Sequence, residues 1–197
     1  MIAKTAIIYP NVEFGQNVVI EDYCIIGMPF KNYNNEKTII GDNAIIRAQT
    51  IIYAGNKIGE NFQTGNKANI RELNNIGDDV SIGTLSVVEH HVEIENNVRV
   101  HTQVFVPEYC ILKQGCWLGP NVVLTNAKYP KSPNVKNELQ GCIVHEKAKI
   151  GANCTVLPGV EIGANSLIGA GSLLTKSVSE NVVVAGNPAK KLRDIHY

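Results

Sequence analysis

An apolar side chain returns at every sixth position over most of the chain. From Ile40 to Leu124, fourteen of fifteen such positions carry Ile, Leu or Val, and Thr64 is the exception. The same period runs through residues 8–26 and 144–174, each time in a shifted frame. A period of six fits neither the 3.6-residue helix nor simple strand alternation, but it fits a short strand followed by a corner. The sequence therefore predicts a repeat of short strands.

Two further columns of residues support this geometry. The side chain two positions before each aliphatic is usually small, as expected if both point inward on the two-residue strand period. Such residues are Ala44, Ala68, Val80, Ser86, Val92, Val98, Val122 and Ser166. Glycine often follows the aliphatic, and we expect it to supply the special dihedral angles of a tight corner. These glycines are Gly41, Gly59, Gly77, Gly83, Gly119, Gly151, Gly163 and Gly169. Three units would make an 18-residue triangular coil, and stacked coils form an all-β solenoid of parallel strands.

The frame shifts mark two insertions. One lies near residues 28–38, around PFKNYNNEK, and the other near residues 126–141, around NAKYPKSPNVKNELQ. A C-terminal extension begins at about residue 177. A chain of 197 residues suits one or at most two domains, and the pattern gives no sign of a second. We expect a single β-helix domain over residues 1–197.

The cysteines test this register. All five are predicted to fall in the small inward column: Cys24, Cys110, Cys116, Cys142 and Cys154. A thiol behaves there as a small buried hydrophobe. An odd number of cysteines without a secretion signal argues against a disulfide framework. We therefore expect buried packing rather than a redox or catalytic role.

Charge and hydropathy exclude several classes of protein. Eighteen Lys plus Arg balance eighteen Asp plus Glu, so the chain offers no general attraction to nucleic acid or to an anionic membrane. The N-terminal stretch MIAKTAIIYPNVEFG lacks a signal-peptide pattern, and no apolar run is long enough to cross a membrane. We expect a cytoplasmic protein.

The repeat resembles that of a known family. The segments IGDNAII, IGDDVSI, IGANCTV and IGANSLI are similar to the hexapeptide-repeat acyltransferases. The resemblance implies a left-handed parallel β-helix that assembles as a homotrimer, with sites between subunits. The handedness comes from the resemblance alone, because crossover connections are generally right-handed.

The closing segment VEIGANSLIGAGSLLTKSVSENVVVAGNPAKKL is similar to the acetyl-coenzyme A end of these enzymes. The resemblance implies acetyl-coenzyme A as co-substrate and a basic group near its 3′-phosphate. Lys176, Lys190, Lys191 and Arg193 are candidates, although these charges could simply keep the C-terminus soluble. The cofactor-binding residues implied are Gly151, Gly169, Ala170, Lys176, Pro188 and Lys190.

The segment CWLGPNVVLTNAKYP, residues 116–130, resembles the loop entrance of nucleotide-sugar N-acetyltransferases that act on amino-deoxy sugars. Because insertions in solenoids often lie on the binding face, we expect Asn126, Lys128 and Tyr129 to contact the substrate, the alternative being ordinary loop-tip residues. Many O-acetyltransferases of the superfamily carry a histidine in this loop. Here Lys128 and Tyr129 occupy that neighbourhood, so a general base must lie elsewhere.

The stretch SVVEHHVEI, residues 86–94, contains two adjacent histidines. With Val88 inward, His90 and His91 fall on the turn, directed away from the core. Residues 18 apart stack at roughly 4.8 Å, the spacing of adjacent strands. One such ladder reads Ala54, Glu72, His90, Glu108 and Asn126, and its neighbour reads Tyr53, Arg71, Glu89, Pro107 and Thr125. We expect the Glu72 carboxylate to orient the His90 imidazole.

The motif SVVEHH is also similar to the SVIEH-type segment of sugar N-acetyltransferases, which implies His90 as general base. Those enzymes tend to have an acid directly after the histidine, where this chain has His91. The alternative for His90 is a solvated turn residue, and His91 and His101 are expected in surface or subunit contacts. Arg71 and Glu89 either form a surface ion pair or bind substrate hydroxyls and phosphates.

Three classes of function follow. The first is an acetyl-coenzyme A-dependent N-acetyltransferase on a nucleotide-linked amino sugar, with O-acetylation of a small hydroxyl acceptor as the alternative. The second is a zinc enzyme of the carbonic-anhydrase type, which needs a histidine well upstream of a close pair. No histidine precedes His90, so no metal is expected. The third is a non-catalytic scaffold, for which the two insertions have no purpose.

Overall fold

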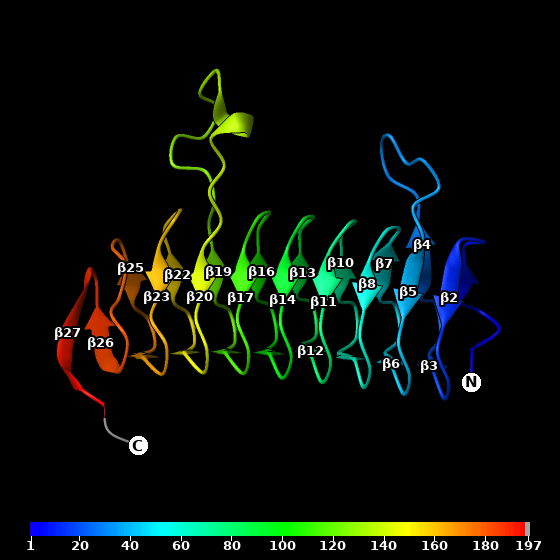
Figure 1. The fold of residues 1–197 in the computed structure, drawn as a ribbon, viewed down its shortest axis with the longest axis horizontal. Helices are drawn as coiled ribbons and strands as arrows, with labels where there is room; N and C mark the ends of the chain where they lie inside the picture. Colours follow the sequence, from blue (N-terminus) through cyan, green and yellow to red (C-terminus); the bar gives the residue numbers. More distant parts are fainter. Residues whose placement is uncertain (196–197) are drawn as a thin grey trace.

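The computed structural model describes residues 1–195 and is an elongated stack of coils around one apolar core (Figure 1). Short parallel strands on each coil align into three sheets, which wind as a left-handed parallel β-helix. The predicted fold class is confirmed.

Within the described residues, the first sheet has nine strands, and the first eight of them lead into the second sheet through a corner or a loop. Its strands are β1 (Ile7–Ile8), β4 (Ile25–Met28), β7 (Ile51–Tyr53), β10 (Asn69–Ile70), β13 (Val87–Val88), β16 (Phe105–Val106), β19 (Val123–Leu124), β22 (Thr155–Val156) and β25 (Leu173–Leu174). The second sheet consists of β2 (Val12–Phe14), β5 (Thr38–Ile40), β8 (Lys57–Ile58), β11 (Asn75–Ile76), β14 (Glu93–Ile94), β17 (Ile111–Leu112), β20 (Ile143–Val144) and β23 (Glu161–Ile162).

The third sheet ends in a hairpin that closes the C-terminal end of the stack. Its strands are β3 (Val19–Ile20), β6 (Ile45–Ile46), β9 (Gln63–Thr64), β12 (Ser81–Ile82), β15 (Arg99–Val100), β18 (Trp117–Leu118), β21 (Lys149–Ile150), β24 (Leu167–Ile168), β26 (Val182–Gly186) and β27 (Ala189–Asp194). All pairings are parallel except β26 with β27, which pair antiparallel. This hairpin covers the sheet edge that the last coil would leave open.

The strand register matches the sequence period. Val87 pairs with Phe105, and Ser81 with Arg99, each 18 residues apart. The step lengthens only where a loop intervenes, as between Val123 and Thr155. The ladders read from the sequence are therefore confirmed as columns of stacked residues.

Both predicted inward columns form the core. The aliphatic column from Ile40 to Leu124 is buried, including Thr64 at 5% exposure. The small column is buried beside it, and all five cysteines have 0% exposure and are free thiols. Burial raises the pKa of the Cys116 thiol, which makes it a weaker nucleophile. The expected packing of the cysteines is confirmed.

The expected role of the corner glycines is wrong. Gly41 and Gly83 do not have positive φ angles; positive φ falls two residues later, at Asn43 (59°) and Leu85 (58°). A side chain at Gly41 would instead meet the backbone of Gly59, whose carbonyl carbon lies 2.6 Å from the position of a Cβ. Glycine is therefore needed because successive coils approach closely, not because of its dihedral freedom.

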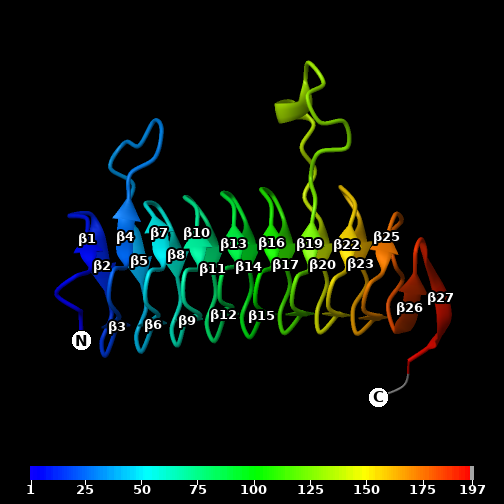
Figure 2. The ribbon, with the colours of Figure 1, turned by 180° about the vertical axis from the view of Figure 1, so that it is seen from behind.

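Two loops project from the stack on the same side (Figures 1 and 2). The first joins β4 to β5, and the second joins β19 to β20 and contains the short 3₁₀ helix η1 (Val135–Asn137). Both leave the edge where first-sheet strands lead into the second sheet; we call this edge the His90 corner, because His90 and His91 join β13 to β14 there. The His90 coil lies between the coils that carry the two loops.

No helix within residues 1–195 is long and apolar enough to span a membrane.

Candidate functional site

The His90 corner carries a column of polar side chains. His90 follows Val88 by two residues, just as Glu108 follows Val106 and Asn126 follows Leu124. Continued across the second loop, the same register places Lys176 two residues after Leu174. Lys176 is four coils from His90, which corresponds to about 19 Å at the usual strand spacing.

The two histidines of this corner contact each other. Nδ1 of His90 lies 2.8 Å from Nδ1 of His91, and the ring centroids are 4.9 Å apart at 85°. The His90 side chain is 26% exposed, and His91 is more exposed. The ring of Tyr109, from the next coil, lies 6.1 Å from His90 and 5.8 Å from His91. The predicted direction of both histidines, away from the core, is confirmed.

Glu108 is the carboxylate beside His90. Its Oε1 lies 3.6 Å from Nε2 of His90, which is an ion-pair distance rather than a hydrogen bond. Its other oxygen, Oε2, accepts a hydrogen bond of 2.7 Å from Nδ2 of Asn126. The amide of Asn126 therefore holds the Glu108 carboxylate, and that carboxylate faces the imidazole.

The expected contact between Glu72 and His90 is replaced by another. Both oxygens of the Glu72 carboxylate accept hydrogen bonds from the Arg71 guanidinium, from Nε at 2.8 Å and from Nη2 at 2.9 Å. Glu72 stacks one coil before His90 as predicted, but the two parallel donors of an arginine make a stronger pair than one imidazole contact. Burial by itself raises the pKa of Glu72, but the Arg71 hydrogen bonds, a backbone hydrogen bond and the nearby positive charge together lower the pKa overall.

Arg71 and Glu89 complete this ionic cluster. Nη1 of Arg71 lies 3.4 Å from Oε2 of Glu89, and the guanidinium carbon lies 4.9 Å from the Tyr53 ring centroid. Burial is the main reason that the pKa of Glu89 is raised, and the hydrogen bonds to Glu72 raise the pKa of Arg71. The guanidinium is thus occupied by two carboxylates and an aromatic face, which supports a structural role over substrate binding.

Asn126 lies at the base of the second loop, whereas Lys128 and Tyr129 lie further along it. The Asn126 carbonyl accepts a hydrogen bond of 2.8 Å from the Gln140 N–H, which closes the base of the loop. Further out, the Lys128 ammonium lies 5.6 Å from the Tyr129 ring centroid, and Tyr129 is 64% exposed. In the described part of the chain, no contact joins Lys128 or Tyr129 to the histidines.

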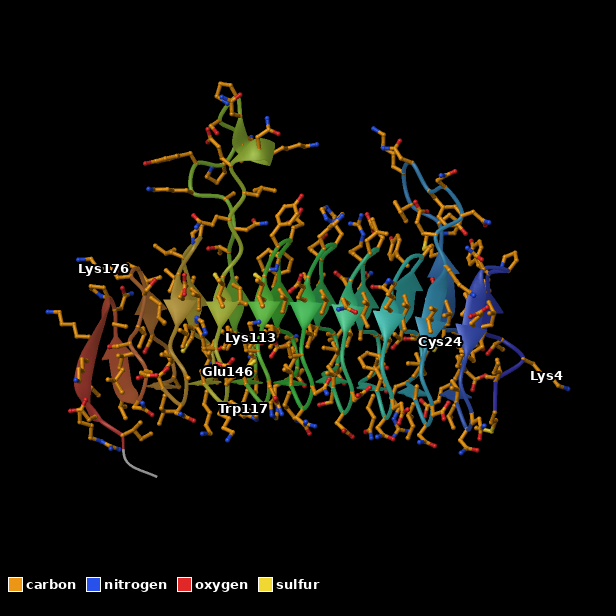
Figure 3. All side chains as sticks on the ribbon, viewed as in Figure 1. Lys4, Cys24, Lys113, Trp117, Glu146 and Lys176 are labelled. Carbon is orange, nitrogen blue, oxygen red and sulfur yellow. The ribbon has the colours of Figure 1, made fainter. Side chains whose placement is uncertain are left out.

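The residues expected to bind the cofactor fall into three places. Lys176 lies on the His90 corner, at the end of the stack that the β26–β27 hairpin closes (Figure 3). Lys176 and Lys191 line a cavity of about 220 Å³ beside this hairpin. Pro188 and Lys190 are exposed on the hairpin.

The remaining three, Gly151, Gly169 and Ala170, follow strands β21 and β24 at the corner between the third and first sheets. Gly151 packs there against Ala170, whose N atom would lie 2.6 Å from an added Cβ. These residues and Lys176 therefore lie on opposite edges of the first sheet.

Residues 141–176 match the family described as bacterial transferase hexapeptide (six repeats). The strand register carries the same six-residue repeat through the rest of the stack. Over residues 141–176 the chain is thus similar to the hexapeptide-repeat transferases. The resemblance noted in the sequence is confirmed at this level.

Relatives of this hexapeptide-repeat protein include named acetyltransferases. It is 38% identical over 99 residues to the galactoside O-acetyltransferase of Lactococcus lactis, covering 48% of this chain and 45% of that enzyme. It is 28% identical over 179 residues to the bifunctional protein GlmU of Clostridium acetobutylicum, covering 91% of this chain and 36% of GlmU. Its alignments thus span less than two thirds of these relatives.

The fold is shared with a solved acyltransferase. The UDP-N-acetylglucosamine acyltransferase of Arabidopsis superposes with a TM-score of 0.61 at 15% identity, covering 98% of this chain and 74% of that one. At this identity the likeness concerns the fold.

Among residues 1–195, no group of three or more His, Cys, Asp or Glu side chains is placed to hold a metal ion.

The sequence predicted the column of this site but not three of its contacts. Glu108 was in the His90 ladder, 18 residues after the histidine, and the same arithmetic that selected Glu72 places it equally close. The competition of Arg71 for Glu72 could also have been foreseen, because adjacent opposite charges lie side by side on the corner. The contact between His90 and His91 left no signal beyond their adjacency, since it depends on side-chain rotamers.

Proposed function

We propose that this hexapeptide-repeat protein transfers the acetyl group of acetyl-coenzyme A directly to the amino group of a nucleotide-linked amino-deoxy sugar. The proposal rests on one observation: the His90 and His91 imidazoles and the Glu108 carboxylate lie together on the corner that also bears both loops. The named acetyltransferases among its relatives support acetyl transfer.

The chemistry suits this cluster. An amine that attacks a thioester must lose a proton, and imidazole is the side chain whose charge changes closest to neutral pH. The resemblance of the SVVEHH motif implies His90 for this role, and Oε1 of Glu108 lies 3.6 Å from Nε2 of His90. Holding amine and thioester in line supplies a further part of the rate.

Acetylation of a hydroxyl acceptor is the second candidate. The relative from Lactococcus lactis is named a galactoside O-acetyltransferase, which favours a sugar hydroxyl. Lys128 and Tyr129, where many O-acetyltransferases of the superfamily carry a histidine, favour an amine. These residues of the second loop are the reason that we prefer an amino group to a hydroxyl group as the acceptor.

An assay of thiol release discriminates these candidates. Purified protein is mixed with acetyl-coenzyme A and a panel of nucleotide-linked 3-amino and 4-amino sugars, each beside its hydroxyl counterpart. We expect thiol release with one amino sugar and none with its hydroxyl analogue. Turnover confined to hydroxyl acceptors would establish the second candidate. No thiol release with any acceptor would contradict acetyl transfer to sugars.

Lys176 is the basic group that we expect to bind the 3′-phosphate of acetyl-coenzyme A. It is exposed, it lines the cavity beside the hairpin, and it lies on the same corner as His90. Because one charge-assisted contact is lost, Lys176→Ala should raise the KM for acetyl-coenzyme A about tenfold and leave kcat nearly unchanged. Lys4→Ala, at the opposite end of the stack, is the matched control (Figure 3). An unchanged KM for Lys176→Ala would remove this lysine from the cofactor site.

Association of subunits fits the outward side of the first sheet. Several residues that face outward there are apolar: Ile7, Ile25, Ile51, Val87, Phe105, Val123 and Leu173. A cyclic assembly would cover this face and place sites between neighbouring chains. The homotrimer stays a prediction, which the molar mass in solution would test.

A further inference from the structure

The two nitrogens of His90 face different partners. Nδ1 lies 2.8 Å from Nδ1 of His91, and Nε2 lies 3.6 Å from Oε1 of Glu108. Between two neutral imidazoles, one Nδ1 must donate its N–H and the other must accept it. The carboxylate favours the proton of His90 at Nε2, because an imidazole lone pair would face a negative oxygen there. His90 therefore accepts at Nδ1, and His91 donates.

This arrangement leaves the lone pair of His91 at Nε2. His91 belongs to the exposed residues of the corner, whereas the His90 side chain is 26% exposed and has a partner at each nitrogen. Of the two imidazoles, His91 thus offers an unprotonated nitrogen on its exposed side. The adjacent Tyr109 ring, at 5.8 Å, limits where the His91 ring can lie.

The backbone of His91 has the conformation that its corner requires. His91 has a φ of 57°, in the left-handed region that favours Gly and Asn. At the equivalent position of this corner, Gly55 and Gly159 stand on other coils with φ of 81° and 71°. Three successive coils instead carry Leu73, His91 and Tyr109, with φ of 61°, 57° and 65°. The same left-handed conformation recurs at other corners, as at Leu85 and Gln103, so it belongs to the turn and fixes where the His91 side chain leaves the backbone.

We propose that Nε2 of His91, in place of His90, accepts the proton of the attacking amine, and that His90 and Glu108 position this imidazole. The inference rests on the proposed function. The amine nitrogen bonds to the thioester carbonyl carbon, the C–S bond breaks, and the proton of the nitrogen passes to Nε2 of His91. That proton then protonates the leaving coenzyme A thiolate, so the imidazole is restored. His91 is the catalytic residue, and His90 and Glu108 are positioning residues.

Charged side chains stand around the pair of histidines. On the preceding coil stand Arg71 and Glu72, on the same coil Glu89, and on the next coil Glu108. Two of these carboxylates, Glu72 and Glu89, pair with the Arg71 guanidinium, and the third, Glu108, faces His90. When His91 takes up a proton, its Nδ1–H proton can shift to His90, whose Nε2–H already faces Glu108.

The first test replaces His91 with a residue that tolerates its backbone. His91→Asn keeps the left-handed turn and should lower kcat on the order of 10²-fold, with the KM values little changed. It should also abolish the loss of kcat at acidic pH that protonation of the base causes. The matched control is Leu85→Asn, at φ 58° on another corner and 48% exposed, which should behave as the wild type. Unchanged kcat for His91→Asn would overturn the proposal.

The second test reads the tautomers and needs no acceptor. Long-range ¹H–¹⁵N correlation spectra of the full chain with ¹⁵N-labelled histidine should show His91 protonated at Nδ1 and His90 protonated at Nε2 above their titration range. Glu108→Gln should weaken the preference of His90 for the tautomer that is protonated at Nε2. The opposite tautomers would overturn the proposed hydrogen bond from Nδ1 of His91 to Nδ1 of His90. If no amine is acetylated, the proposed function fails. The tautomers then show separately whether His91 donates its Nδ1–H to His90.

Discussion

His90→Ala should lower turnover about 10²- to 10⁴-fold, with much smaller changes in the Michaelis constants. The substitution removes the imidazole that contacts both His91 and Glu108, at 2.8 Å and 3.6 Å. Because His90 positions the base His91, its loss affects the transition state more than substrate binding. Steady-state kinetics with the acceptor found in the panel measure kcat and KM separately.

The control for this prediction is another histidine beside a carboxylate. Nε2 of His145 lies 3.1 Å from Oε2 of Glu161, outside the His90 corner, so His145→Ala should leave turnover unchanged. The double variant of His90 and His91 separates the roles of the pair. If the two imidazoles act as one unit, the double variant should be no slower than the slower single variant. Wild-type turnover in His90→Ala would remove His90 from the mechanism.

Much of the fold could be predicted because one physical requirement repeats along the whole chain. Each coil must bury an aliphatic residue and a small neighbour, so the six-residue period fixes which residues point inward and which stack. The register of His90 with Glu108 followed from this period alone. The reason for the glycines did not, because the close approach of Gly41 to Gly59 is a contact between coils rather than a property of either segment.

The site was less predictable, because stacking fixes neighbours but not partners. Glu72 and Glu108 are equally spaced from His90 in the ladder, but their carboxylates have different hydrogen-bond partners. Arg71 binds Glu72 with two donors, and Asn126 holds Glu108 beside the imidazole. Such a choice depends on competing side-chain hydrogen bonds, which a repeat pattern does not encode. Residues within the second loop lie outside the period altogether, so their positions could not be derived from it.

Phe62 is the largest departure from the small inward column. It stands where neighbouring coils of the third sheet carry Ala44, Val80 and Val98, and it is 0% exposed. Two residues later, Thr64 is the break in the aliphatic column, and its Oγ1 lies 3.2 Å from Oγ1 of Thr50. The larger ring at Phe62 and the shorter side chain at Thr64 lie on the same inward face of one coil, so together they keep its core volume near that of other coils.

Phe62→Ala should therefore lower the free energy of unfolding by about 3 to 5 kcal/mol, since it removes a buried ring and leaves a cavity that rigid coils cannot close. Val80→Ala, in the same column one coil further, should cost less because it removes fewer buried atoms. Leu85→Ala, with 48% exposure, should change stability by no more than about 0.5 kcal/mol. Chemical denaturation followed by circular dichroism measures all three. In a stack where each coil contacts only its neighbours, a loss at Phe62 weakens both adjoining interfaces. Equal losses for Phe62→Ala and Val80→Ala would contradict the compensation between Phe62 and Thr64.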